Sequence, residues 1–522
     1  MSFRLTYATM FNPPEAMHER FEQSLARLRQ QLGQTYPLYV NGRDVEASVH
    51  EERPSPIDSQ CRLGRFPMAQ LADVDAALAA AMAAFPGWRA TSVAERARLL
   101  RSVADLMEER VYDIAAALVL EVGKNRLEAL AEAQETVDFF RCYADDFESH
   151  KGFQNALPND PLEGFVSRNQ SILRPYGPWA IIAPFNFPLA LAGGPVAAAL
   201  VTGNTVVVKC ASDTPWAGRW LADCIRDAGL PPGVFNYVSG SGAAVGEALV
   251  SDPRTAGVTF TGSVTVGRSI LAAMVAGRYP RPCIAEMGGK NPCLVTEHAD
   301  LDRAANGLVR SAYGMGGQKC SATSRLYVHE SVADELLARI EKLIDAIRIG
   351  DPSRRENWLG PVVNARAYGS YARYVAQLRE GGAKLRRGGR QLTDGDLARG
   401  FYVEPVLAEG APEHPLWRDE MFLPILMAQR YRDRDRAMAL ANDTDMGLTA
   451  GIFGSAEEVR WFQDNIEAGV TYANRGQGAT TGAWPGYQPF GGWKGSGSTG
   501  KAIASFYYLQ QYLREQSQTT VE

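Results

Sequence analysis

Three side chains that could together perform covalent chemistry stand in glycine- or proline-rich turns of this chain. Cys320 lies in the stretch GGQKCSA, Glu286 in EMGGKNP and Asn186 in PFNFP. A thiol can attack a carbonyl carbon, a carboxamide can donate to the resulting oxyanion, and a carboxylate can deprotonate water. The three residue types therefore predict a covalent oxidation site with Cys320 as nucleophile, Asn186 as oxyanion donor and Glu286 as general base.

Short β-branched runs that alternate with helices must position these side chains. The expected strands are Trp179–Ile182, Thr205–Val208, Val234–Val238 and Val258–Phe260, and the expected helices between them are Leu189–Leu200, Trp216–Ala228 and 243–250. A second series of this kind runs from 284 to about 475. Such alternation is typical of parallel sheets with crossover helices, so it predicts an α/β fold. Residues 15–33, 69–83 and 94–120 read as helices, 151–170 as a protruding loop or hairpin, and 506–513 as strand-like.

Bulk composition limits the class of protein. The chain has 522 residues, 46% hydrophobic content and a net charge of −5, which predict two or three domains and argue against a nucleic-acid partner. Seven scattered cysteines without a CxxC pair predict no disulfide framework and favour a reducing cytosol. Six dispersed histidines offer no HExxH-type pair, so no catalytic metal is expected.

Two stretches bear on targeting and membranes. Glu15, Glu19 and Glu22 interrupt the N-terminal region and no apolar core follows, so no signal peptide is expected and the cytoplasm is the expected location. Residues 175–208 contain no charged side chain, but Pro178, Pro184, Pro188 and Pro195 would break a membrane helix. A buried strand, loop, helix and strand are expected there instead.

A glycine turn that could bind a phosphate follows the expected strand Val258–Phe260. Thr261, Gly262 and Ser263 lead into a helix whose first backbone N–H groups would attract an anion. Gly242 and Gly246 form a second, looser cluster. The alternative interpretation is that both are ordinary strand–helix turns, since the usual dinucleotide fingerprint is not matched.

The Cys320, Glu286 and Asn186 motifs together resemble the aldehyde dehydrogenase superfamily, over nearly the whole chain. The resemblance implies two Rossmann-like α/β domains with parallel sheets and a small β oligomerisation element. It assigns 1–150 and 171–285 to an NAD(P)-binding domain, 286–475 to a catalytic domain, and 151–170 with 476–522 to oligomerisation. A homodimer or larger homo-oligomer is therefore expected.

The same resemblance implies a binding site for NAD. Its residues would be Pro184, Phe185, Lys209, Ser212, Gly242, Gly246, Phe260, Thr261, Gly262, Ser263, Val266, Glu420 and Phe422. Lys209 would bind the adenine ribose, and Glu420 and Phe422 would hold the nicotinamide ribose and ring. Ser212 stands where NAD-preferring members often carry Glu, so NADP is expected to serve as well.

A narrower resemblance points to a substrate. Glu121–Asn125, Gly317–Ala322 and Thr481–Gly492 look like the 1-pyrroline-5-carboxylate dehydrogenase group, which oxidises glutamate γ-semialdehyde to glutamate in proline catabolism. It implies that Ser321 and the backbone N–H groups of Gly482 and Ala483 bind the α-carboxylate, while Phe187 and Phe490 sandwich the aliphatic stem.

Other functions stay open on the sequence alone. Glu286 favours release of a free acid over acyl transfer to coenzyme A. Bulky Trp484-Pro485, and Met446 where Tyr is usual, keep another semialdehyde or an aromatic aldehyde as alternative substrates. A cysteine-dependent hydrolase would need a histidine base, and no histidine lies in any motif. A non-enzymatic binding protein on the same scaffold is the remaining alternative.

Overall fold

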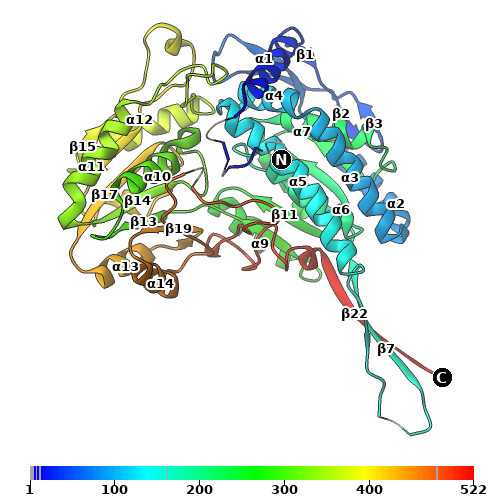
Figure 1. Cartoon of the computed structure of the whole chain (residues 1–522). Coiled ribbons are helices and arrows are strands. Elements are labelled where there is room, and N and C mark those ends of the chain that lie inside the picture. The colour runs from blue at the N-terminus through cyan, green and yellow to red at the C-terminus, as the bar shows by residue number, and fades with distance from the viewer. Residues whose placement is uncertain (1–4, 8, 11–12, 162, 478–479) are drawn as a thin grey trace.

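The computed structural model describes residues 5–7, 9–10, 13–161, 163–477 and 480–522. They form two α/β lobes, each built on a largely parallel seven-stranded sheet, and a narrow β arm that projects from one lobe (Figure 1). The predicted α/β class with parallel sheets is confirmed. The division into domains at the expected boundaries stays a prediction.

The first sheet has the strand order β12-β11-β8-β9-β10-β2-β3. Its strands are β2 (Leu38–Val40), β3 (Arg43–Val45), β8 (Pro178–Ile182), β9 (Thr205–Lys209), β10 (Phe235–Val238), β11 (Gly257–Thr261) and β12 (Cys283–Glu286). Its crossover helices are α2 (Leu71–Ala90), α6 (Ala190–Val201), α7 (Pro215–Asp227), α8 (Glu247–Ser251) and α9 (Val264–Val275), with a π-helical turn at Gly242–Gly246 before α8. β2 and β3 run antiparallel at one edge.

The uncharged stretch 175–208 forms the centre of this sheet. It supplies β8, α6 and β9, as the sequence predicted. Val206 and Val208 pack into one apolar cluster and Val207 into the cluster on the opposite face. Burial on both faces explains why this strand is a continuous apolar run.

Four helices from the N-terminal region cover the first lobe. They are α1 (Glu15–Arg29), α3 (Val93–Glu109), α4 (Val111–Val122) and α5 (Arg126–Ser149). α4 ends at Gly123, whose φ of 84° is the left-handed conformation that glycine adopts without strain. A small sheet beside them contains β1 (Gln34–Thr35), β4 (His50–Pro54) and β5 (Arg62–Pro67).

The second sheet has the order β15-β16-β17-β14-β13-β19-β20. Its strands are β13 (Asn291–Val295), β14 (Thr323–His329), β15 (Lys384–Arg387), β16 (Val406–Glu409), β17 (Ile425–Tyr431), β19 (Thr449–Phe453) and β20 (Val470–Ala473). Its helices are α10 (Leu301–Tyr313), α11 (Glu330–Asp345), α12 (Ala365–Glu380), α13 (Arg434–Asn442) and α14 (Ala456–Asn465). The chain changes sheets between Glu286 and Asn291, so the EMGGKNP turn joins the two lobes.

The β arm contains β6 (Gln154–Leu157), β7 (Ser167–Pro175) and β22 (Leu513–Val521). β22 pairs antiparallel with β7 along its full length, although their sequences are more than 300 residues apart (Figure 1). The strand-like segment expected at 506–513 therefore lies further along the chain. Residues Leu509–Tyr512 form a 3-10 turn instead, because Tyr508 and Tyr512 are buried and bonded to each other through their hydroxyl groups.

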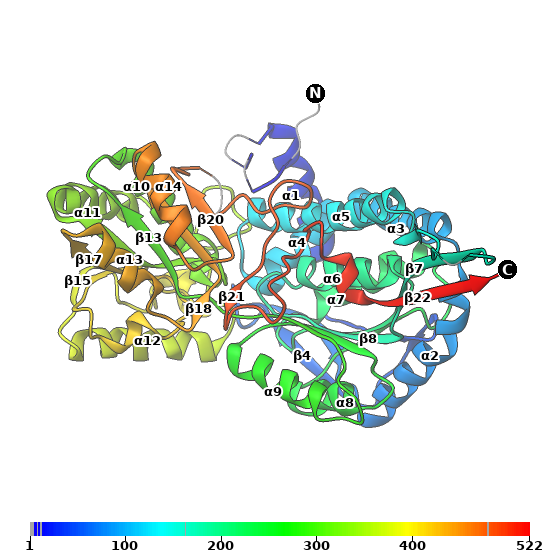
Figure 2. The ribbon, with the colours of Figure 1, turned by 90° about the horizontal axis from the view of Figure 1, so that it is seen from below.

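The C-terminal segment before β22 runs between the two lobes (Figure 2). β21 (Trp493–Lys494) pairs with β18 (Met446–Gly447) of the second lobe. Ser496 and Ser498 then bond to the backbone around Glu286 and Ala285 of the first. This segment ties the two lobes together at the turn that carries Glu286. Within the described residues, no helix is long and apolar enough to cross a membrane.

Candidate active site

Cys320 lies on a tight loop between α10 and β14. Asn291 holds this loop, since its side-chain N–H2 donates to the carbonyls of Cys320 (2.6 Å) and Ala322 (2.9 Å). The side-chain oxygen Oδ1 of Asn291 also accepts a hydrogen bond from Thr449 N (3.0 Å). A Cβ on Gly317, whose φ is +67°, would lie 2.3 Å from the Leu423 carbonyl. Close backbone packing therefore requires glycine at position 317, three residues before Cys320.

Glu286 ends β12 at the lobe boundary. Its Oε2 is buried and has no hydrogen-bond partner among the described residues. Burial raises the pKa of Glu286 well above its usual range, and a backbone hydrogen bond from Gly492 offsets this only in part. A buried carboxyl with an unused oxygen and a raised pKa has the properties of a proton acceptor that works near neutral pH.

Burial also raises the pKa of the Cys320 thiol, to about 12, and the negative charges of Glu420 and Glu286 add to the effect. Because the charge of Glu286 acts on the Cys320 thiol, the two groups belong to one site. The chain alone thus keeps the thiol protonated at neutral pH. A positive charge beside the sulfur would be needed to favour the thiolate.

Asn186 is buried, with 3% of its surface exposed, in the turn between β8 and α6. Lys124 Nζ donates to the Asn186 carbonyl (2.8 Å) and lies over the Phe187 ring, 4.3 Å from its centroid. Glu132 pairs with Lys124 and accepts from the Leu189 backbone (2.9 Å). A buried ion pair thus fixes this turn. The role of Asn186 as oxyanion donor stays a prediction.

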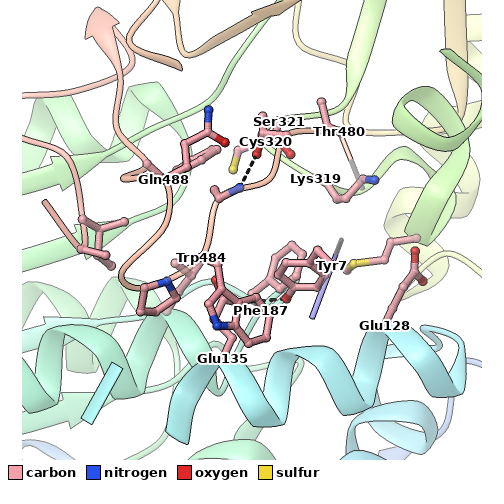
Figure 3. Close-up of a pocket in the computed structure, with 18 of the residues that line it drawn as sticks. Tyr7, Glu128, Glu135, Phe187, Lys319, Cys320, Ser321, Thr480, Trp484 and Gln488 are labelled. Carbon is pink, nitrogen blue, oxygen red and sulfur yellow. Dashed lines mark hydrogen bonds between the residues drawn. The ribbon is translucent and has the colours of Figure 1, made fainter. Parts of the chain in front are cut away.

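A cavity of about 110 Å³ opens beside Cys320 (Figure 3). Four of the residues expected at the substrate line it, namely Ser321, Ala483, Phe187 and Phe490. The two amides expected to bind a carboxylate have internal acceptors here. Gly482 N donates to Gln488 Oε1 (2.9 Å) and Ala483 N to Thr481 Oγ1 (3.1 Å).

The far wall of this cavity contains residues that the sequence analysis missed. Tyr7, from the N-terminal segment, donates to Glu135 Oε2 (2.9 Å) and packs edge-on against Trp484, with the ring centroids 5.3 Å apart (Figure 3). Glu128 lies one heptad before Glu135 on α5. That spacing puts both carboxyl groups on one helix face, a signal the sequence did contain. Nothing in the sequence indicates Tyr7.

The cofactor side of Cys320 also has defined geometry. Glu420 Oε1 accepts from Gly289 N (2.9 Å), and a Cβ on Gly288 would lie 2.0 Å from Glu420 Oε2. Phe422, with φ +55°, meets Phe185 edge-on at 5.7 Å. The structure thus brings the predicted Glu420, Phe422 and Phe185 together next to the Cys320 loop.

Lys290 lies in the EMGGKNP turn beside Glu420, and the sequence analysis did not predict it as a site residue. Its Nζ is buried with no acceptor in the described part of the chain. Burial and the nearby Arg325 guanidinium lower its pKa to about 7, while burial raises the pKa of Glu420 to about 7. A buried amine whose donors are unused among the described residues fits an anionic or hydroxyl-bearing ligand.

The expected adenosine end lies along the carboxyl edge of the first sheet. Ser263 caps α9 by accepting from Val266 N (3.4 Å), and Val266 is 48% exposed although apolar. A Cβ on Gly262 would lie 2.5 Å from the Phe260 ring, so this turn needs glycine. Gly242 and Gly246 have open space around them. Thr261 is the last residue of β11, and Pro184 lies two residues after the end of β8.

Lys209 is the last residue of β9, and Ser212 follows it at this edge. Burial lowers the pKa of Lys209, and Ser212 Oγ donates to the Gly240 carbonyl (2.9 Å). Arg53 lines a small cavity with Ser212 and pairs with Asp213 (2.7 Å). A helix N-terminus with an exposed apolar side chain, and a buried lysine at the end of the neighbouring strand β9, fit a dinucleotide, which would supply a hydride acceptor beside Cys320.

Comparisons with known proteins agree with this geometry. The model of the aldehyde dehydrogenase family matches residues 45–517. A 1-pyrroline-5-carboxylate dehydrogenase of Geobacillus sp. (strain WCH70) is 36% identical over 514 residues, 97% of each chain. 1-Pyrroline-5-carboxylate dehydrogenase 2 of Bacillus subtilis (strain 168) is 37% identical over 491 residues, 93% of each chain.

The fold has a solved counterpart as well. The structure of 1-pyrroline-5-carboxylate dehydrogenase from Thermus with bound NAD superimposes with a TM-score of 0.92 at 34% identity. It covers 100% of this chain and 99% of that chain. With the family match over most of the sequence, these findings confirm the resemblance, and the chain belongs to the aldehyde dehydrogenase family.

Proposed function

We propose that this chain oxidises glutamate γ-semialdehyde to glutamate with NAD(P). The observation that carries the proposal is the charge pattern of the Cys320 cavity. The Ser321 hydroxyl offers a donor that suits a carboxylate, while Glu128 and Glu135 on the opposite wall suit an ammonium group. Burial raises the pKa of Glu135 to about 8, so a cationic ligand would draw it toward the charged form. An amino-acid aldehyde carries both complementary charges.

The chemistry follows from the residues around the sulfur. Cys320 Sγ attacks the aldehyde carbon and forms a thiohemiacetal, whose oxygen receives hydrogen bonds from the Asn186 side chain and the Cys320 backbone N–H. Bound NAD(P) supplies the hydride acceptor, and a thioester remains on Cys320. Glu286 then removes a proton from water, the hydroxide attacks the thioester carbonyl, and the C–S bond breaks to release the acid.

A substrate panel tests this proposal. The specificity constant kcat/KM is measured for glutamate γ-semialdehyde, succinate semialdehyde, pentanal and benzaldehyde, with NAD at saturation. The first substrate should exceed pentanal by about a hundredfold, because two desolvated charged contacts favour it. Equal kcat/KM for glutamate γ-semialdehyde and pentanal would exclude glutamate γ-semialdehyde as the specific substrate. A higher kcat/KM for benzaldehyde would favour an aromatic aldehyde as the substrate.

We infer that both NAD and NADP are accepted. Ser212 removes the carboxylate that would repel a 2′-phosphate, and the Arg53 guanidinium lies beside it in the same small cavity. Asp213 neutralises part of that positive charge, which supports NAD as the better cofactor. Dissociation constants for NAD and NADP, measured by the quenching of protein fluorescence, test this inference. Binding of NAD without measurable binding of NADP would contradict it.

We also infer that the chain forms a homodimer or a larger homo-oligomer. The β arm leaves the edges of β6 and β22 uncovered, and Phe165, Val166 and Val521 on it are more than half exposed. A projecting sheet with open edges and apolar tips favours pairing with another subunit. Light scattering at micromolar concentration tests this, and a monodisperse monomer would contradict it.

A further inference from the structure

A basic cleft lies between α10 and the segment that begins at the end of β20. Its volume is about 800 Å³, and its lining includes Arg303, Arg310 and Arg475 with the side-chain amides of Asn306, Asn474 and Gln477. Among the lining residues in the described chain, none is acidic. A concave surface lined by cations and amides concentrates small anions. We call this surface the arginine cleft.

The arginine cleft and the Cys320 cavity share the lining residue Arg310. This residue, near the end of α10, lines both hollows. Burial lowers the pKa of Arg310, yet a guanidinium stays charged at neutral pH. An anion held in the cleft is therefore separated from the cavity beside Cys320 by the length of one shared side chain at most.

Arg475 places a second charge directly against the substrate loop. A Cβ on Gly482 would lie 2.8 Å from Arg475 Nη1 and 3.1 Å from Cζ, so the guanidinium packs on the backbone of this loop. Among the residues that the structure describes, none accepts a hydrogen bond from its buried Nε. No acidic side chain in the described ranges forms a salt bridge with Arg475, whereas Arg303 lies near Asp300 (3.8 Å) at the exposed rim. Arg475 is thus the cation best able to serve a ligand.

We propose that the arginine cleft is the entrance site for carboxylate-bearing aldehydes and the exit site for the carboxylic acid product, with Arg475 as its principal cation. The inference rests on the proposed function and adds residues outside the Cys320 cavity to it. The cleft attracts the α-carboxylate, and Arg475 then adds a positive field behind the Gly482 and Ala483 amides. Substrates without a carboxylate gain nothing from it, so Arg475 determines specificity without taking part in the covalent steps.

Kinetics with two aldehydes of equal chain length test the proposal. Wild type, Arg475→Gln, Arg475→Lys and the surface control Arg373→Gln are assayed with glutamate γ-semialdehyde and with pentanal. Arg475→Gln should raise KM for the semialdehyde about tenfold, as expected for the loss of one charged contact, and leave pentanal turnover unchanged. Arg475→Lys should restore part of the loss, and added salt should weaken the wild-type preference.

Titration of the full-length protein with L-glutamate gives a readout without turnover. The dissociation constant should rise in Arg475→Gln by the same factor as KM and stay at the wild-type value in Arg373→Gln. An equal loss of activity with both aldehydes, or unchanged glutamate affinity, would overturn the cleft proposal. The proposed function has a separate outcome, since it fails if the wild type itself does not prefer the semialdehyde to pentanal.

Discussion

The two sides of Cys320 are built in different ways. On the cofactor-facing side, a Cβ on Gly289 would lie 2.5 Å from the Cys320 carbonyl, so two short motifs meet by backbone contact. On the substrate-facing side, Tyr7, Glu135 and Trp484 come from three distant segments and meet only through side chains. Where two backbones touch, no larger side chain fits without moving the chain. Where side chains form the wall, a substitution changes the shape of the cavity and leaves the backbone in place. The first side should therefore be rigid and the second adaptable.

The largest effect is expected at the boundary between the two sides, where we propose that Glu286 activates the water that attacks the thioester. Glu286→Gln should reduce steady-state kcat about thousandfold, because it removes the general base for hydrolysis. The first turnover should persist, since hydride loss precedes the step that needs Glu286. Stopped-flow detection of NADH would then show a burst of about one equivalent per active site.

Glu297→Gln changes an exposed carboxylate that lies outside both sites and serves as the matched control. Full steady-state turnover by Glu286→Gln would remove this residue from the mechanism and leave hydrolysis to another base.

One glycine substitution on each side of Cys320 tests whether the cofactor-facing side is more rigid than the substrate-facing side. Gly289→Ala places a methyl group 2.5 Å from the Cys320 carbonyl and from Asn291 Oδ1, so it must displace the nucleophile loop. Displacement by about 1 Å costs about a hundredfold in kcat. Gly482→Ala meets only the end of the Arg475 side chain, at 2.8 Å, which can move aside. Its effect should stay within a few-fold for pentanal. Similar losses in the two variants, with unfolding excluded by circular dichroism, would contradict the comparison.

The same contrast explains what the sequence could predict. EMGGKNP and GGQKCSA are local motifs that meet where Gly289 packs against the Cys320 carbonyl, so both could be recognised from the sequence alone. The central strands were predictable because burial on both faces makes β9 a continuous apolar run. Asn291 was within reach of the same reasoning, since it stands in a motif already singled out. Its hydrogen bonds to the Cys320 loop depend on a parallel strand pair that the sequence implied.

The remaining residues could not be predicted for a physical reason. Tyr7 and Arg475 act through long side chains whose direction depends on packing between segments far apart in sequence. No periodicity marks such contacts. The displaced β22 has a similar origin: residues 506–512 are as aromatic as a strand, but Tyr508 stacks on Tyr143 and ends the segment in a 3-10 turn. Tertiary contacts overrode local propensity there.

The ionisation of Cys320 gives a smaller, graded effect on the cofactor side. Burial and the charges of Glu420 and Glu286 raise the thiol pKa to about 12, so the reactive thiolate is scarce at neutral pH and increases as pH rises. Alkylation of Cys320 by iodoacetamide, followed by mass spectrometry, should accelerate about tenfold per pH unit up to pH 10. Added NAD should increase the rate at pH 7, because a cationic ring favours the thiolate.

Cys293 offers an internal reference for this experiment, since it is fully buried in the second lobe and burial raises its pKa as well. A plateau in the Cys320 rate below pH 8 without cofactor would mean that the chain activates the thiol unaided.

The smallest effect should come from Tyr7, where the adaptable wall can be probed one atom at a time. Tyr7→Phe keeps the ring against Trp484 and Phe187 but removes the hydrogen bond to Glu135 Oε2. Loss of one buried hydrogen bond should raise KM for glutamate γ-semialdehyde a few-fold and leave kcat and pentanal unchanged. Because that bond lowers the pKa of Glu135 against the effect of burial, its loss should shift the KM–pH profile to higher pH.

Tyr7→Ala should instead widen the cavity and improve kcat/KM for benzaldehyde. If both variants lost activity equally toward every aldehyde, Tyr7 would be a packing residue, and the substrate-facing wall would be as rigid as the cofactor-facing turn.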